Sequence, residues 1–189
     1  AFEKMISEVE EFKIEGGKDG ANGYVYFYCN EIVDPNSGWK VPLASNWVID
    51  GGIGTYAKLT PHAPSKSFNI EIINGGTQSD LKQAKLEATW RNGLRSPVDR
   101  NGNVLPPENR VPISAESLRG SQGLGLWGST QIVPGADDKF QERLYCIRWQ
   151  VPEEQNDGSI RYKREYAAPD AADLKREEKV LELLVDRFN

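Results

Sequence analysis

The amino-acid sequence predicts a mainly β protein, folded as a single antiparallel β-barrel or β-sandwich domain with an amphipathic helix at each terminus. Apolar and polar residues alternate in many short runs, turn-forming pairs such as Asn74-Gly75 separate these runs, and no long helical pattern lies between them. Strands joined by short turns favour a barrel or sandwich over a parallel sheet. A chain of 189 residues suits one core, so we expect residues 1–189 to form one domain.

Both ends of the chain have helical periodicity. Residues 1–16 repeat apolar side chains at intervals of three and four positions, until Gly16-Gly17 ends the pattern. Residues 170–188 have the same spacing, and an aspartate-rich start suits the positive end of a helix dipole. The sequence therefore predicts an N-terminal helix over 1–16 and a C-terminal helix over 170–188.

Residues 22–167 form the predicted β core. The strands expected in it lie at 24–30, 46–50, 66–74, 82–90, 124–133, 139–151 and 159–166. The last two form the best-defined pair, because Asp157-Gly158 between them is a hairpin signal. In 82–90 small and apolar residues alternate with Lys85, Glu87 and Thr89, which favours a half-exposed strand, although Ser79 could begin a short helix instead.

The β core is interrupted by a long Arg/Pro-rich loop, residues 93–123, for which neither a helix nor a long strand is expected. Loops of this length are usually functional or disordered. Between positions 91 and 119 five arginines outnumber three acidic residues, and four prolines stiffen the chain. The arginines, candidates for binding a partner protein with an acidic surface, are Arg91, Arg95, Arg100, Arg110 and Arg119. The alternatives are a loop that packs on its own domain, or one that contacts phosphate groups.

Composition limits the class of partner. The net charge is −5, which argues against nucleic acid as the main ligand because phosphate binding requires a basic surface. No apolar run approaches the roughly 18 residues that span a bilayer, so we expect a soluble protein without a membrane span. The chain begins with Ala1, which suggests processing from a precursor and leaves its location unassigned. Cys29 and Cys146 both lie in strand-like runs and are expected to be buried, reduced thiols.

The sequence predicts no catalytic residue, cofactor or metal site. Gly52-x-Gly54-x-x-Ala57 follows a strand like a dinucleotide-binding turn, but Pro61 leaves no room for the helix that such a turn begins, so the glycines are expected to serve a turn or bulge. His62 is the only histidine and lies between prolines, without a nucleophile motif nearby. A pair of strand carboxylates, Glu71 and Glu87, is the remaining option for acid–base chemistry.

Gly38-Trp39 lies early in this β-rich chain and resembles the first strand of lipocalin-type barrels. In those barrels one residue separates the glycine from the tryptophan, whereas here the two are adjacent, so no residue role is carried over from the family. The resemblance implies a small apolar ligand or a pigment inside the fold. Aromatic residues that could line such a site are Tyr24, Trp47, Trp90 and Trp149.

Three functions remain open. The first is a non-enzymatic structural or assembly protein that docks into a larger complex through the extended Arg/Pro-rich loop. The second is a lipocalin-like small-molecule or pigment-binding module. The third is a carboxylate-based enzyme that acts on glycans through Glu71 and Glu87.

Overall fold

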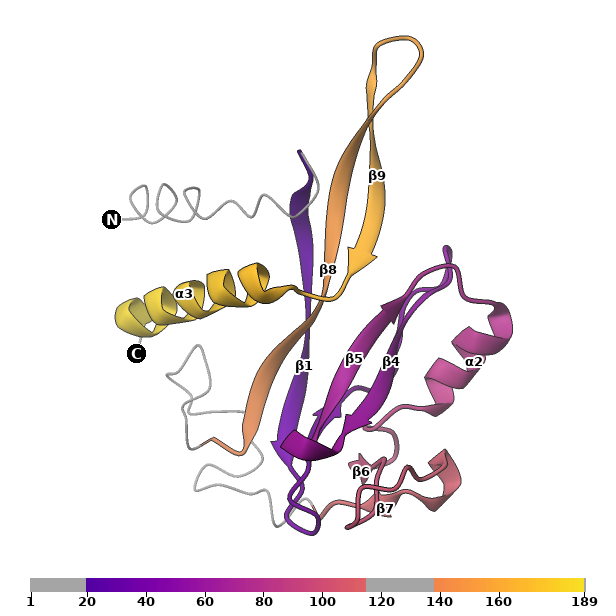
Figure 1. Cartoon of the computed structure of the whole chain (residues 1–189), viewed down its shortest axis with the longest axis vertical. Coiled ribbons are helices and arrows are strands. Elements are labelled where there is room, and N and C mark those ends of the chain that lie inside the picture. Colours follow the sequence, from indigo (N-terminus) through magenta and orange to yellow (C-terminus); the bar gives the residue numbers. More distant parts are fainter. Residues whose placement is uncertain (1–19, 115–137, 189) are drawn as a thin grey trace. The chain divides into compact units, whose positions relative to one another are not determined.

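The computed structural model describes residues 20–114 and 138–188, and these form a mainly β structure (Figure 1). It contains a curled antiparallel sheet, shaped like half of a barrel, and two α-helices. The mainly β, antiparallel character predicted from the sequence is therefore confirmed. The described strands belong to three separate sheets, none of which closes on itself, so the predicted closed barrel or sandwich is not seen in this part of the chain.

The largest sheet has four strands in the order β2-β1-β8-β9. Their bounds are β1 Asn22–Val33, β2 Lys40–Leu43, β8 Phe140–Glu154 and β9 Ile160–Ala167. A second sheet has the order β3-β4-β5, with β3 Val48–Asp50, β4 Thr55–His62 and β5 Ser67–Ile73. The third is a two-stranded sheet of β6 Arg95–Ser96 and β7 Val111–Pro112.

The chain divides into two compact units, which are described separately. The central unit consists of residues 28–143, and the terminal unit of residues 1–27 together with 144–189. In the core of the central unit Trp39 packs on Phe68, with their ring centroids 5.5 Å apart. The buried members of this core are Ile32, Trp39, Val41, Leu43, Phe68, Leu94, Val98, Ile113 and Phe140. A smaller cluster in the terminal unit comprises Leu144, Ile147 and Trp149, with Tyr26 and Val151 packed against it.

Most predicted strands within the described residues are confirmed. The strands expected at 24–30, 46–50, 66–74, 139–151 and 159–166 correspond to β1, β3, β5, β8 and β9. Sequence reasoning missed β2 and β4, because Pro42 and Pro61 lie inside them and a proline argues against a strand. The predicted helix at 1–16 and strand at 124–133 lie outside the described residues.

The strand predicted at 82–90 is wrong and the alternative of a short helix is confirmed, because Gln78–Leu86 form helix α2. A reciprocal capping box starts this helix: the N–H of Asp80 donates to Thr77 Oγ1 over 3.3 Å, and the N–H of Thr77 donates to the Asp80 carboxylate over 2.8 Å. Leu81 and Ala84, three positions apart, are the buried side chains of α2. The start signal and this spacing outweigh the alternation that suggested a strand.

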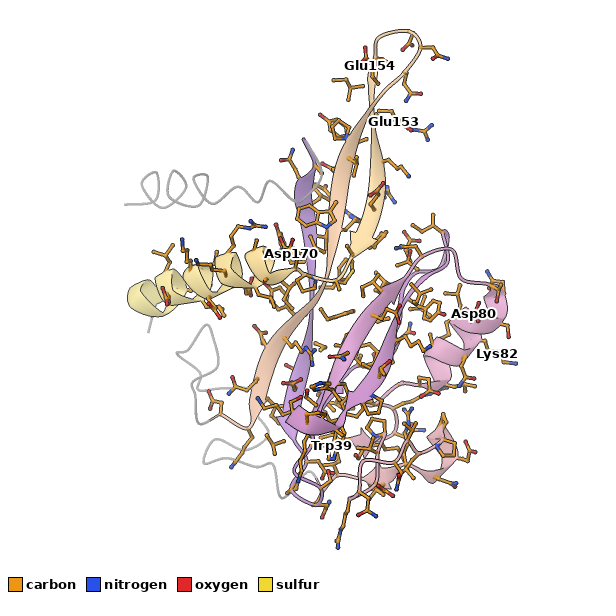
Figure 2. The ribbon with its side chains drawn as sticks, viewed as in Figure 1. Trp39, Asp80, Lys82, Glu153, Glu154 and Asp170 are labelled. Carbon is orange, nitrogen blue, oxygen red and sulfur yellow. The ribbon has the colours of Figure 1, made fainter. Side chains whose placement is uncertain are left out.

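The C-terminal helix is confirmed as α3, Ala171–Phe188. Asp170, labelled in Figure 2, and Asp173 exchange backbone-to-carboxylate hydrogen bonds of 2.9 and 2.8 Å at its start. Asp173 is buried and pairs with Arg176 one turn later. Neither α2 nor α3, the described α-helices, combines the length and the apolarity needed to cross a membrane.

The described part of the Arg/Pro-rich loop folds onto the central unit. Leu94, Val98 and Ile113 are buried in that unit's core. β6 pairs with β7 in the register Arg95↔Pro112 and Ser96↔Val111, and a short 3₁₀ helix, η2 (Pro107–Asn109), precedes β7. The strands in 94–113 are two residues long, so no long strand is found there, and the loop packs on its own unit instead of extending from it.

Glycine serves the turn between β3 and β4, as predicted. It also allows this turn to approach Gly76, which follows β5, closely. The register shifts between Val48 and Asp50, and Gly54 enters β4 with a φ of +73°. A Cβ atom on Gly54 would lie 2.3 Å from the carbonyl oxygen of Gly76, whose N–H donates to the Gly54 carbonyl over 2.8 Å. Only a residue without a side chain fits this contact.

We expect Gly54→Ala to lower the free energy of unfolding by about 1–3 kcal/mol, because it adds positive-φ strain and a backbone clash. Gly51→Ala in the same turn is the matched control, since a Cβ there meets nothing within 4 Å and the φ is not positive. The control should change stability by less than about 0.5 kcal/mol. Equilibrium urea unfolding measures both, and equal losses would contradict the close-contact account.

Cys29 and Cys146 are buried free thiols, as predicted. Burial raises the pKa of each to about 12. At pH 8 the folded protein therefore holds only about one thiol in ten thousand as thiolate. We expect Ellman's reagent to leave the native protein unmodified and to react with both thiols once guanidinium unfolds the chain. Rapid reaction of either thiol in the native state would contradict this account.

Candidate functional site

Arg110 is the buried centre of the Arg/Pro-rich loop, with 4% of its surface exposed. Its Nη1 donates to the carbonyl oxygens of Glu87 and Ala88, over 2.8 and 3.0 Å, and its Nη2 pairs with the Glu87 carboxylate. Glu87 is the C-cap residue of α2, so the guanidinium lies at the negative end of that helix. Burial lowers the pKa of Arg110 below its usual value, although an arginine side chain stays charged there.

The segment that follows α2 is fixed by further hydrogen bonds within the central unit. Trp47, which is fully buried, donates its Nε1 proton to the same Glu87 carbonyl over 3.1 Å. The hydroxyl of Thr89 donates to the Pro42 carbonyl over 2.7 Å and accepts from the N–H of Ala44 over 3.0 Å. These hydrogen bonds therefore hold the end of α2 and the loop in fixed positions within the central unit.

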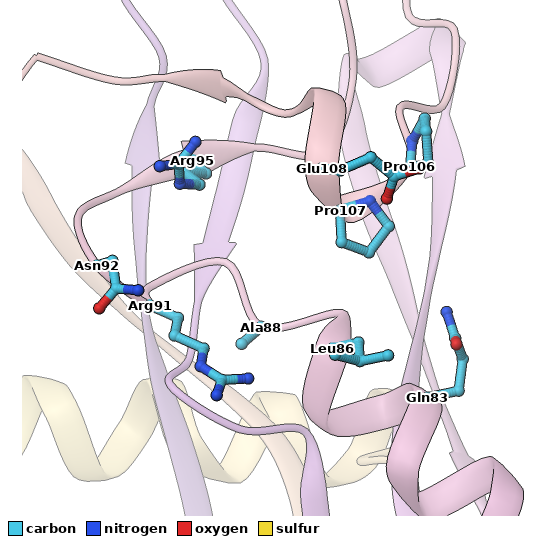
Figure 3. A pocket seen from close by; sticks show the side chains of 9 residues that line it. All are labelled: Gln83, Leu86, Ala88, Arg91, Asn92, Arg95, Pro106, Pro107 and Glu108. Carbon is cyan, nitrogen blue, oxygen red and sulfur yellow. The ribbon is translucent and has the colours of Figure 1, made fainter.

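A cleft of about 570 Å³ lies between α2 and the Arg/Pro-rich loop. Figure 3 shows its lining, which comprises Gln83, Leu86, Ala88, Arg91, Asn92, Arg95, Pro106, Pro107 and Glu108. Arg91, Asn92 and Arg95 lie on one side, opposite the two prolines and Glu108. Positive φ angles at Asn92 (+56°) and Gly93 (+100°) turn the chain sharply between the two arginines.

The cleft combines charge with an apolar wall. Arg91 is exposed, while Arg95 is half-buried and donates from Nη1 to the Arg110 carbonyl over 3.4 Å. Leu86 remains 46% exposed beside Pro106 and Pro107. The volume lies within the roughly 300–1,000 Å³ common for ligand sites. Among the described residues of the lining, Glu108 is the only carboxylate and there is no serine, cysteine, histidine or lysine, so their chemistry suits binding better than proton transfer.

The predicted arginines occupy different environments. Arg91 and Arg95 line the cleft, Arg110 is buried and donates to the end of α2, and Arg100 is exposed outside the lining. Arg119 lies outside the described residues. The apolar wall was missed by sequence reasoning, which treated the prolines only as stiffeners. The Asn92-Gly93 turn signal was the one indication that the arginines on either side could face a common space.

The aromatic residues proposed for a small apolar ligand are divided between the two units, and none lines the cleft. In the central unit Trp47 is fully buried, whereas Trp90 is 42% exposed and stacks on Phe140 with centroids 6.4 Å apart. In the terminal unit Trp149 is 9% and Tyr24 58% exposed, and Tyr24 lies under the guanidinium of Arg148. Trp47 and Trp149 therefore act in packing.

The groups considered for catalysis are engaged locally or exposed. The carboxylate of Glu87 pairs with Arg110, and Glu71 is an exposed residue of β5 opposite Lys58. His62 ends β4 rather than lying in a loop, and its Nδ1 is 2.6 Å from the Ser65 hydroxyl at an exposed turn. Within residues 20–114 and 138–188, no three His, Cys, Asp or Glu side chains gather as a metal site would require.

We expect Arg110→Met to lower the free energy of unfolding by about 2–4 kcal/mol, because α2 loses its charged C-terminal partner and two buried carbonyls lose a donor. Arg100→Met, which removes the same charge from an exposed position, should cost less than about 0.5 kcal/mol. Thermal and urea unfolding compare the two variants. A stability loss no larger than that of the control would show that the Arg110 contacts do not hold the loop in place.

Comparison with known proteins assigns no family to this chain. No protein-family model, no curated protein and no solved structure matches it. The functional interpretation therefore depends on the geometry of the cleft and on the charges that line it.

Proposed function

We propose that this protein is a non-enzymatic interaction module that joins a larger protein assembly by holding an acidic, extended segment of a partner in the cleft. The observation that carries this proposal is the placement of Arg91 and Arg95 across the cleft from Pro106 and Pro107. This revises the idea of an extended arm, because residues of the loop line both sides of the cleft.

The cationic side suits carboxylates. Arginine offers a planar fork that pairs with a carboxylate through two hydrogen bonds, and such charged bonds are the stronger ones in proteins. Arg91 and Arg95 are four positions apart on either side of a sharp turn, so they can engage two acidic side chains of one extended segment. Because the whole chain carries a net charge of −5, an acidic segment depends on local cations such as these for its binding.

The opposite wall suits an apolar side chain of the same segment. The rings of Pro106 and Pro107 are rigid, and Leu86 on α2 is exposed beside them. A rigid wall loses little conformational entropy when a ligand binds, which favours affinity. The preferred segment therefore carries acidic residues that alternate with an aliphatic one.

The proposal is tested with a fluorescein-labelled hexapeptide of alternating glutamate and leucine. Its affinity for the native protein is compared with its affinity for the Arg91→Gln variant. Fluorescence anisotropy should show saturable binding to the native protein, and Arg91→Gln should weaken it about tenfold, because one charged pairing is lost. Arg100→Gln removes an equal charge outside the cleft and should leave the affinity unchanged within about twofold. Point variants are used because a deletion would remove Leu94, Val98 and Ile113 from the core.

A hexapeptide of alternating lysine and leucine controls for apolar adhesion. Equal binding of both peptides, or equal effects of the two arginine variants, would contradict the proposal. Failure of the acidic probe to bind the native protein would contradict it as well.

A further inference from the structure

We infer that the outer edge of β9 is a second docking site, which takes an acidic extended segment of a partner protein as an added β-strand. This site belongs to the terminal unit, whereas the cleft belongs to the central unit, so the inference does not depend on the proposed function. It depends on the pairing, the exposure and the charge of β9.

β9 is the last strand of the four-stranded sheet, and no described strand pairs with its outer edge. Its register with β8 runs without a shift from Ile147↔Ala167 to Glu154↔Ile160. The edge is therefore eight residues long, regular, and without proline or a bulge. Edge strands usually carry a proline, a bulge or charged side chains that prevent pairing with another chain, and of these β9 has only the charges.

The outer half of the β8–β9 hairpin is exposed on both faces. Residues 160–164 are all exposed, and so are Glu153 and Glu154 opposite them (Figure 2). Ile160 and Tyr162, which share one face, are 61% and 55% exposed. In Figure 1 this end of the hairpin extends past the start of β1. A two-stranded ribbon alone is marginally stable in water, so an added third strand would stabilise it.

The charged side chains of β9 indicate which kind of segment would pair with it. β9 carries Arg161, Lys163 and Arg164 against a single acid, Glu165, which is 3.3 Å from Lys163. Neither Arg161 nor Arg164 forms an ion pair with another of the described residues. Glu153 and Glu154 lie on the inner strand β8. An incoming strand therefore meets Arg161 and Lys163 on one face of β9 and Arg164 on the other.

A second copy of β9 is a poor occupant, because it would place two basic strands side by side, and like charges opposite one another destabilise a sheet. An acidic strand gains cross-strand pairs with Arg161 and Lys163, which share one face of β9. Apolar residues at alternating positions would lie next to Ile160 and Tyr162 on the other face. Main-chain hydrogen bonds would supply much of the affinity, as in other cases of β-strand addition.

The test uses the full chain and a labelled octapeptide of alternating glutamate and valine. Fluorescence anisotropy should show binding, and the same peptide with N-methyl groups on alternate residues should bind at least about tenfold more weakly, because it cannot complete the ladder. Arg161→Gln should weaken binding roughly threefold, whereas Lys175→Gln, an exposed position on α3, should not. Arg91→Gln should also leave this binding intact, which separates the two sites.

Hydrogen exchange followed by mass spectrometry supplies an independent measurement. The amides of 160–167 should exchange faster in the free protein than in the peptide complex. The inference is overturned if those amides of 160–167 that point away from β8 are already protected in the free chain, if the N-methylated peptide binds equally well, or if sedimentation shows a dimer that Arg161→Gln dissociates.

Discussion

The guanidinium of Arg110 is the contact on which the central unit's functional geometry depends. It joins two parts of the chain that are 23 positions apart, at the end of helix α2 and before β7. A buried ion pair adds little net stability over an apolar replacement, since both charges lose water. Here, however, the same cation satisfies two backbone carbonyls at a helix end, where a positive charge is favourable. Its main effect is positional, because it fixes the loop to α2.

This fixed position changes the meaning of the arginine-rich composition. A flexible arm would lose conformational entropy on docking, whereas a groove held by Arg110 and Trp47 is already ordered before a ligand arrives. The arginines divide between two roles. Arg110 is buried and holds the loop against α2, while Arg91 and Arg95 line the cleft. Composition alone cannot distinguish these roles, because both use the same residue type.

The sequence was informative wherever one local signal dominated. Period-two alternation located β5, β8 and β9, a continuous aromatic and apolar run located β1, and the spacing of leucines located α3. It failed where two signals conflicted, as in α2, whose Thr77–Asp80 capping box competed with an alternating pattern. It also failed over the Arg/Pro-rich loop, where Leu94, Val98 and Ile113 are isolated apolar residues without a period. Their burial is set by contacts distant in sequence. The cleft depends on such contacts too, because its lining comes from the end of α2, from residues 91–95 and from residues 106–108.

The contact between Gly54 and Gly76 has a consequence for how the sequence can vary over evolution. A Cβ atom on Gly54 would lie 2.3 Å from the Gly76 carbonyl oxygen, and one on Gly76 would lie 2.6 Å from the Tyr56 ring. A side chain at Gly54 therefore requires a change in the path of the turn at Gly76, and a side chain at Gly76 requires the Tyr56 ring to move. Homologous chains should keep glycine at both positions, or alter both turns together, and that joint pattern would identify relatives of this fold even where the rest of the sequence has diverged.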